Sequence, residues 1–323
     1  MRALIATLRP LTAFATPLAG DTLFGQLCWA IRHGWGEARL AALLDGYTAD
    51  RPFLVVGDAL PAGHLPLPAL PAAYWAGQSS NAAERKALKQ KVWLPLAAVG
   101  TPLEGWQQQA VTHRLSGAES HSQPQPRNSL DRLTGATGKG DGFSPYTVRQ
   151  HWHDADARLD IHLRLDEERL PYADLAIAIE QVGTAGFGKD ANVGLGKFEL
   201  TDIREFPLQG QDDPSAWLTL APCAPQGLAW NGACCFYRPL TRYGRHGDLA
   251  ARSATPFKSP LLLAAAGALL APRGVEDWSR GWIGQGLGGD GSVSRSLPAT
   301  VHQGYAPAIP VRLPTSILRR EAA

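Results

Sequence analysis

The spacing of apolar residues predicts a regular first half of the chain. The apolar run Ala3–Leu8 predicts a first strand, which ends at Pro10 because proline cannot donate to a strand ladder. Apolar side chains then recur at helical spacing over residues 22–31, so we expect a helix there. Asp21 stands where an N-cap belongs, and Gly34 stands where a C′ glycine belongs.

Further elements extend this pattern to residue 205. The short apolar run Phe53–Val56 predicts a buried strand, and strict alternation over 158–166 predicts a strand with one solvated face. Pro171 opens a helix with one apolar face, and a strand follows at 197–204. The order is strand, helix, strand, long insertion, strand, helix, strand. This is the βαββαβ ferredoxin-like order, with an insertion of about a hundred residues before its third strand.

The insertion and the second half are less regular. A polar helix is predicted around 82–91, and the segment 116–144, rich in Gly, Ser, Pro and Gln, is the most loop-like in the chain. Strands are predicted at 217–220, 234–240 and 301–313. Residues 261–270, rich in Leu and Ala, fit a helix or a buried strand equally well.

Composition excludes several classes of protein. With 45% hydrophobic and 19% charged residues, the chain is neither disordered nor equipped with charged tails. The N-terminus lacks the long apolar region of a signal peptide, and the longest apolar stretch, Leu261–Pro272, is too short to span a membrane. The four cysteines form no CxxC pair, so we expect neither a zinc ribbon nor a disulfide framework, and a cytoplasmic location.

The strongest local motif is the glycine-rich segment 183–197, and it fails two nucleotide-binding patterns. Gly183–Asp190 nearly spells a P-loop, but Asp190 replaces the magnesium-binding hydroxyl, and a strand rather than a helix follows. A dinucleotide fingerprint would need glycine where Ala191 stands. The segment is either a turn that needs positive φ at several glycines, or a loop whose backbone approaches a phosphodiester chain. In the second case Lys189 and Lys197 would supply charge, and Phe187 a stacking face.

A second glycine cluster at 281–294 permits the same two interpretations, an RNA contact or a flexible surface loop.

The sequence gives only weak indications of a catalytic site. His151–Asp156 suggests metal ligands, yet it directly precedes a strand and lacks a distant partner, so we predict a solvated turn. His302 is the best candidate for a general base, against the alternatives of an RNA hydrogen bond or plain packing.

Four segments together resemble the RAMP superfamily of CRISPR proteins, whose members carry a glycine-rich loop before the last strand of a ferredoxin-like unit. They are Thr16–Ala30, Arg127–Gly140, Gly186–Phe198 and Val301–Val311, in the family's order. Within the superfamily, the chain most resembles the Cas-five-like fourth subunit of type III-A Csm effector complexes. The nearest alternative is the equivalent subunit of the type III-B Cmr complex.

The resemblance implies an α+β fold of tandem ferredoxin-like (RRM-like) domains. The first, residues 1–205, would carry a β-hairpin thumb at about 116–150 and the glycine-rich loop 183–197. The second, residues 206–323, would be degenerate and strand-rich, with the glycine-rich loop 281–294.

The resemblance also implies a function. The chain would be a non-catalytic, RNA-binding subunit that binds and caps the 5′ tag of the crRNA. It would bridge the large polymerase- or cyclase-like subunit to the backbone RAMP subunits, with no cofactor, metal or membrane partner. The alternative is a metal-independent RAMP endoribonuclease that processes CRISPR repeat RNA.

Candidate RNA-binding residues follow from this role, because single-stranded RNA is held by cations, stacking surfaces and close backbone approach. In the thumb they are Arg127, Asn128, Arg132 and Lys139. In the first glycine loop they are Gly186, Phe187, Gly188, Lys189, Asn192 and Lys197. In the second half they are Arg238, Arg242, Arg245, Lys258, Gly286, Gly288, Ser292, Ser294, Arg295 and His302.

The formal net charge of only +2 first argues against a nucleic-acid binder. The net charge of the whole chain conceals an uneven distribution along it. Residues 1–100 carry 9 cations and 6 anions, residues 101–205 carry 11 cations and 16 anions, and residues 206–323 carry 11 cations and 7 anions. A subunit of a ribonucleoprotein also needs acidic and neutral faces for its protein neighbours. We therefore expect a narrow RNA track rather than a broadly basic surface.

Overall fold

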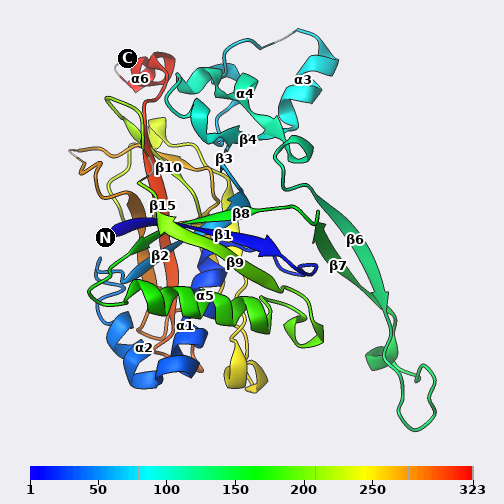
Figure 1. Cartoon of the computed structure of the whole chain (residues 1–323). Helices are drawn as coiled ribbons and strands as arrows, with labels where there is room; N and C mark the ends of the chain where they lie inside the picture. The colour runs from blue at the N-terminus through cyan, green and yellow to red at the C-terminus, as the bar shows by residue number, and fades with distance from the viewer. Residues whose placement is uncertain (79, 208, 275, 322–323) are drawn as a thin grey trace.

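Two antiparallel sheets form the centre of the molecule and confirm the α+β class (Figure 1). The computed structural model describes residues 1–78, 80–207, 209–274 and 276–321. The first sheet has the strand order β2-β8-β1-β9. Its strands are β1 (Arg2–Pro10), β2 (Leu54–Pro61), β8 (Leu159–Leu165) and β9 (Phe198–Glu205).

Helices cover one face of this sheet, as the periodicity predicted. α1 (Gly20–Trp35) and α5 (Tyr172–Ala185) pack side by side on it, and α2 (Glu37–Leu44) follows α1 (Figure 1). Two details differ from the prediction. α1 continues past Gly34 and ends at Gly36, whose φ of 89° suits glycine. Asp21 is not the N-cap, because the helix begins at Gly20 and Asp21 lies in its first turn.

The opposite face of the first sheet is also covered, so the predicted solvated face of β8 is wrong. Asp160 and His162 are only 6% and 4% exposed. Thr7 Oγ1 and the Gly63 amide both donate to the Asp160 carboxylate, at 2.7 and 2.9 Å. Alternation shows which side chains share a face, but not whether another part of the chain covers it.

Part of that cover comes from the second half of the chain, where the Gly281 carbonyl accepts a 3.0 Å hydrogen bond from Arg164 Nε of β8. The second sheet has the order β13-β10-β15-β14 and is antiparallel throughout. Its strands are β10 (Ala216–Thr219), β13 (Leu269–Leu270), β14 (Trp282–Gly288) and β15 (Val301–Val311). The ambiguous segment 261–270 is strand, split into β12 (Leu261–Ala264) and β13, and β12 pairs with β11 (Pro239–Arg242). The predicted strand at 234–240 therefore begins only at Pro239. Among the described residues no α-helix lies between β10 and β15, and α6 (Thr315–Glu321) follows them.

The insertion between β2 and β8 has two parts. The first packs on the second half of the chain, where Leu65, Trp75 and Trp106 share a core with Leu218 and Ile309. Its elements are β3 (His64–Pro66), α3 (Ala82–Lys89), β4 (Lys91–Pro95), α4 (Trp106–Gln109) and β5 (Val111–Thr112).

The second part is a hairpin that projects away from the body (Figure 1). It pairs β6 (Ser120–Arg127) with β7 (Tyr146–His153) and carries residues 128–145 at its tip. We call this hairpin and its tip the thumb. His151–His153, predicted as part of a solvated turn, lie on β7 instead.

Short 3-10 turns connect these elements. They are Ala72–Tyr74, Leu96–Ala98, Leu103–Gly105, His113–Leu115, Asp141–Phe143, Ala191–Val193, Gly232–Cys234 and Asp248–Arg252. None of the helices in the described part of the chain is long and apolar enough to cross a membrane.

Candidate RNA-binding interface

The glycine-rich loop between α5 and β9 is a closed turn held by its own backbone. The Phe187 amide donates to the Gly196 carbonyl at 2.9 Å. Gly186, Gly188, Gly194 and Gly196 all have positive φ, between 74° and 97°. A Cβ on Gly196 would lie 2.2 Å from the Phe187 carbonyl oxygen. The glycines are thus required by the fold of the loop, as the turn interpretation predicted.

The loop is fixed to the segment that follows β1. The Lys189 amide donates to Thr16 Oγ1 and the Lys197 amide donates to Thr12 Oγ1, each at 2.9 Å. The Gly196 amide donates to the Ala13 carbonyl at 2.8 Å. These bonds position the two lysines on a rigid support rather than on a mobile loop.

One predicted contact of this loop is wrong. Phe187 is fully buried in the main core, so it cannot offer a ring face to a base. Aromatic residues beside glycines are as useful for filling a core as for stacking, and the sequence alone does not separate the two. Lys189 and Asn192 are exposed and Lys197 is partly exposed, so all three can contact a ligand.

The base of the thumb lies against this loop. Arg127 pairs with Asp190 at 3.1 Å, and both side chains are mostly buried. Phe14 and His151 exchange backbone hydrogen bonds of 2.8 and 2.9 Å, and the Phe14 ring meets His153 edge-on. The thumb, the glycine loop and the residues after β1 therefore form one surface. Arg127 has a protein partner here, which its sequence position did not reveal.

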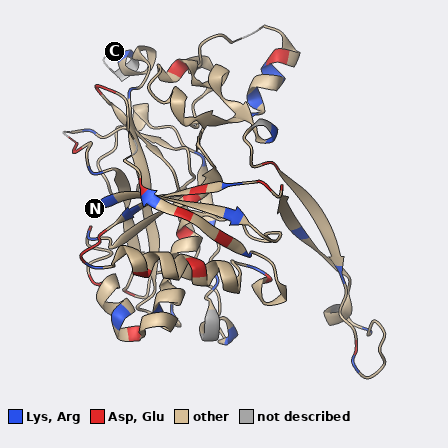
Figure 2. Cartoon of the chain, in the orientation of Figure 1, with Lys and Arg blue, Asp and Glu red and all other residues tan. Residues whose placement is uncertain are grey.

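The thumb tip is the most exposed part of this surface. Arg132, Lys139 and Asn128 are exposed, and Asn128 Nδ2 donates to Thr137 Oγ1. Figure 2 shows Lys and Arg along the thumb. The sequence reasoning missed Leu133, which is 96% exposed; a lone leucine in a polar loop was the available signal.

The first half of the second glycine cluster is strand rather than a flexible surface loop, because β14 spans Trp282–Gly288. Gly286 and Gly288 lie in β14, and Gly286 is buried against Tyr47, whose carbonyl oxygen would lie 2.4 Å from an added Cβ. Ser294 is also buried and bonds His246 Nε2 at 2.7 Å, so it is closed to RNA. The remaining candidates of this cluster, Ser292 and Arg295, are exposed.

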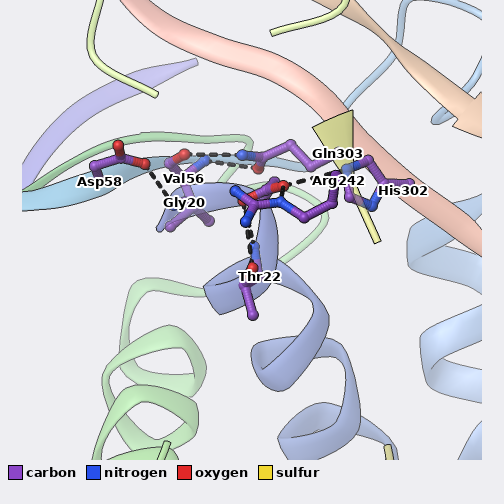
Figure 3. Close-up of polar contacts among 8 residues, drawn as sticks. Gly20, Thr22, Val56, Asp58, Arg242, His302 and Gln303 are labelled. Carbon is purple, nitrogen blue, oxygen red and sulfur yellow. Dashed lines mark hydrogen bonds and ion pairs between the residues drawn. The ribbon is translucent and has the colours of Figure 1, made fainter. Parts of the chain in front are cut away.

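Arg242 and His302 meet a buried carboxylate at the start of α1 (Figure 3). Arg242 donates twice to Asp21, at 2.6 and 2.9 Å, and His302 Nε2 lies 3.4 Å from the same carboxylate. Burial alone would raise the pKa of Asp21, but the adjacent His302 imidazole and the Arg242 guanidinium together hold it below its ordinary value. This cluster links α1 to the second half of the chain. Arg242 and His302, both predicted to bind RNA, are engaged with Asp21 instead.

A second carboxylate and a buried amide complete this junction (Figure 3). Asp58 accepts a 2.7 Å hydrogen bond from the Gly20 amide. The pKa of Asp58 is raised to about 7: burial is the main cause, the Gly20 hydrogen bond opposes it, and the nearby Asp21 charge adds to the rise. Gln303, fully buried on β15, bonds the amide and the carbonyl of Val56, each at 2.8 Å.

The cations predicted on 238–258 divide between two faces. Arg242 faces α1, and Lys258 is largely enclosed, so that burial lowers its pKa. Arg238 and Arg245 are exposed. Among the described residues no group of three or more His, Cys, Asp or Glu is arranged to hold a metal ion.

Comparison with known proteins gives a match at the level of structure only. No family model and no curated protein sequence matches the chain. Solved structures match almost its whole length. A chain of a Csm1-Csm4 cassette in complex with pppApA aligns with a TM-score of 0.62 at 16% identity, over 97% of this chain and 99% of that one. A chain of the Csm3-Csm4 subcomplex of the type III-A CRISPR-Cas interference complex aligns with a TM-score of 0.57 at 12% identity, over 96% and 99%.

The matched chains in these assemblies are Csm4. This chain has the Csm4 fold. The predicted resemblance to the fourth subunit of type III-A complexes is thereby confirmed for the fold, over nearly the whole chain. The same Csm4 fold recurs in a Csm1-Csm4 cassette in complex with AMPPNP, with a TM-score of 0.62 at 17% identity.

Proposed function

We propose that this chain is the Csm4 subunit of a type III-A CRISPR effector complex. The observation that carries the proposal is the Csm4 fold over 97% of the chain. In the similar structures, Csm1 and Csm3 accompany Csm4. The corresponding partners of this chain would be a large Csm1-type subunit and a Csm3-type backbone subunit, in the cytoplasm.

The proposed ligand is the 5′ tag of the crRNA, which the subunit would bind and cap. Support comes from the convergence of the thumb, the glycine loop and the residues after β1 on one surface. This surface offers the exposed cations Arg132, Lys139 and Lys189 together with the amide of Asn192. Cations and amides on a narrow surface suit a single strand, in which phosphates and base edges are both accessible.

We propose that the two sheets belong to a pair of ferredoxin-like units. The first sheet, with helices after its first and third strands, has the order expected of one such unit. The second sheet is also four-stranded and antiparallel, but among the described residues it lacks helices between its strands. We infer that it is the degenerate second unit.

We further propose that the subunit is not catalytic. The candidate general base His302 has a side chain only 8% exposed and directed at Asp21, whose side chain is fully enclosed. A base that abstracts a proton from RNA must come within hydrogen-bond reach of it. The alternative, a metal-independent endoribonuclease, predicts site-specific cleavage of a CRISPR repeat RNA in EDTA that is lost in His302→Ala.

Binding of a tag-containing crRNA to the full chain tests the proposed ligand. The double variant Arg132→Ala/Lys139→Ala should bind more weakly, and the slope of log K against log salt should fall by about 0.7 for each phosphate that is no longer neutralised. Neither residue supports the core, so the melting temperature should stay unchanged.

A matched double variant, Arg273→Ala/Arg319→Ala, removes two exposed cations of the second half and should leave affinity and slope unchanged. Equal losses in the two double variants would show nonspecific attraction and contradict a thumb site. If the wild-type chain binds no crRNA and does not copurify with Csm1-type and Csm3-type subunits, the proposed function itself is wrong.

A further inference from the structure

The hairpin β11–β12 and its extension to residue 257 present two different faces. Along β11 and the residues after it, exposed and enclosed positions alternate, as expected of a strand. The pairing continues beyond the strands through a bridge between Arg245 and Phe257. The tip of this extension, yellow in Figure 1, projects from the body beside α1 and in the same direction as the thumb.

The inward face fixes the hairpin to the rest of the molecule. Arg242 is held by Asp21 of α1, and His246 bonds the buried Ser294. The Lys258 amide donates to the Gly244 carbonyl, which keeps the two arms paired. The outward side chains therefore stand on a well-anchored ribbon.

The outward face is aromatic and cationic. Tyr243 and Phe257 are 75% and 69% exposed, and Tyr237 is 48% exposed. The Arg245 guanidinium lies over the Phe257 ring, 5.8 Å from its centroid. Arg238 is also exposed, and only one residue of 237–262 is acidic. Exposed aromatic rings that are grouped on one ribbon indicate a binding surface.

We infer that this face binds single-stranded RNA, with Tyr243 and Phe257 stacking on bases and Arg238 and Arg245 contacting phosphates. The inference rests on the proposed function and adds a second contact outside the thumb and the glycine loop. Aromatic rings with arginines between them are the combination that holds a single strand without reading its sequence.

The arrangement favours RNA over a protein partner. Aromatic rings and arginine occur in both kinds of interface, but a stable protein interface buries a compact patch of about 800 Å² on each partner. Here the rings follow a narrow ribbon, separated by Thr241 and Arg245, and one ring is already covered on one side by a guanidinium. A single strand that follows this ribbon can place a base on the face of the Phe257 ring that Arg245 leaves open.

The test compares two RNAs of about 16 nucleotides, the upper site size of a single-strand-binding module. One has a mixed sequence and the other is abasic with the same phosphates. The full chain carrying Tyr243→Ala/Phe257→Ala should bind the base-containing RNA about 10-fold or more weakly, because removing each base–ring stack weakens binding measurably. Its affinity for the abasic RNA should equal that of the wild type.

Two controls complete the design. Leu262→Ala removes an exposed apolar side chain, 58% exposed, without a ring, and should not change RNA affinity. Tyr243→Phe/Phe257→Tyr keeps both rings and should restore wild-type binding, which separates stacking from misfolding.

Equal loss on both RNAs, or no loss on either, would overturn the inference. Failure to copurify with a Csm1-type or Csm3-type subunit at unchanged RNA affinity would assign the face to a protein instead. These results are distinct from a failure of the proposed function, which appears as a wild-type chain that binds no RNA.

Discussion

Glycines that share one loop make different demands on the fold. Gly194 and Gly196 both have positive φ, 93° and 74°. Around Gly194 nothing lies within 4 Å of an added Cβ, whereas at Gly196 the Cβ would overlap the backbone of Phe187. Gly194 is therefore needed only for its positive φ, whereas Gly196 is needed both for its positive φ and because a Cβ would not fit beside Phe187.

We predict that Gly196→Ala costs more stability than Gly194→Ala. The left-handed conformation alone costs an alanine about 1–2 kcal/mol, which is the expected loss for Gly194→Ala. Gly196→Ala adds the overlap with Phe187, worth roughly 1–3 kcal/mol more. Urea unfolding followed by circular dichroism measures both free energies. Equal losses would mean that the loop can relax away from Phe187.

The junction carboxylates predict opposite pH effects. The pKa of Asp58 is raised in the folded chain to about 7 from 3.8, so the unfolded chain releases this proton first as pH rises. The contribution of Asp58 to the free energy of unfolding is therefore present below about pH 4 and is lost as the pH rises through 7. The pKa of Asp21 is lowered, so its contribution is present above pH 4 and is lost as pH falls.

Compared with the wild type, Asp58→Asn should therefore gain more unfolding free energy at pH 8 than at pH 5. The amide keeps an oxygen to accept from the Gly20 amide, but it has no charge to desolvate. The measurement is the difference in unfolding free energy between variant and wild type at the two pH values, which cancels the titration of other groups. Asp21→Asn is the control, and it should destabilise at both values because it leaves Arg242 without its partner. A difference for Asp58→Asn that does not change with pH would contradict the raised pKa.

At the scale of elements, local pattern predicted the first sheet better than the second. β1, α1, β8, α5 and β9 follow apolar periodicities within single segments of the sequence. In the second sheet β13 has only two residues, and the preceding β12 has four, so neither is long enough for a periodicity to separate strand from helix over 261–270.

The same limit explains the misassigned glycines of β14. Gly286 is small because the Tyr47 backbone approaches it, and Gly284 would place a Cβ 2.1 Å from the Gly304 carbonyl. A glycine required for close packing and a glycine required for a turn look identical in sequence. The candidate site shows this too: Lys189, Arg132 and Lys139 proved accessible, whereas Phe187 and Ser294 are enclosed by parts of the chain distant in sequence.

At the scale of the molecule, the two halves share their cores. The main cluster around α1 includes Trp282 and Tyr305 from the second half, and Tyr305 donates to the Tyr47 carbonyl at 2.8 Å. Conversely, Leu65 and Trp106 of the insertion belong to the core of the second half. The boundary proposed near residue 205 therefore separates two sheets, but not two hydrophobic cores.

The chain should consequently unfold as one cooperative unit. Tryptophans lie in both halves, among them Trp106 and Trp282, so fluorescence and far-ultraviolet circular dichroism should report coincident transitions. The fragment 1–205 alone would expose Leu65 and Trp106 and lose Tyr305, and we expect it to show no cooperative transition.

Replacing thumb residues 128–145 with a short turn is the matched control for that experiment. The tip is exposed and outside the main cores, so its removal should leave the melting temperature of the remaining chain nearly unchanged. A fragment 1–205 that melts cooperatively near the temperature of the full chain would show that the first sheet and its helices suffice as an independent core. Shared residues such as Tyr305 would then stabilise the contact between the halves rather than the fold of either one.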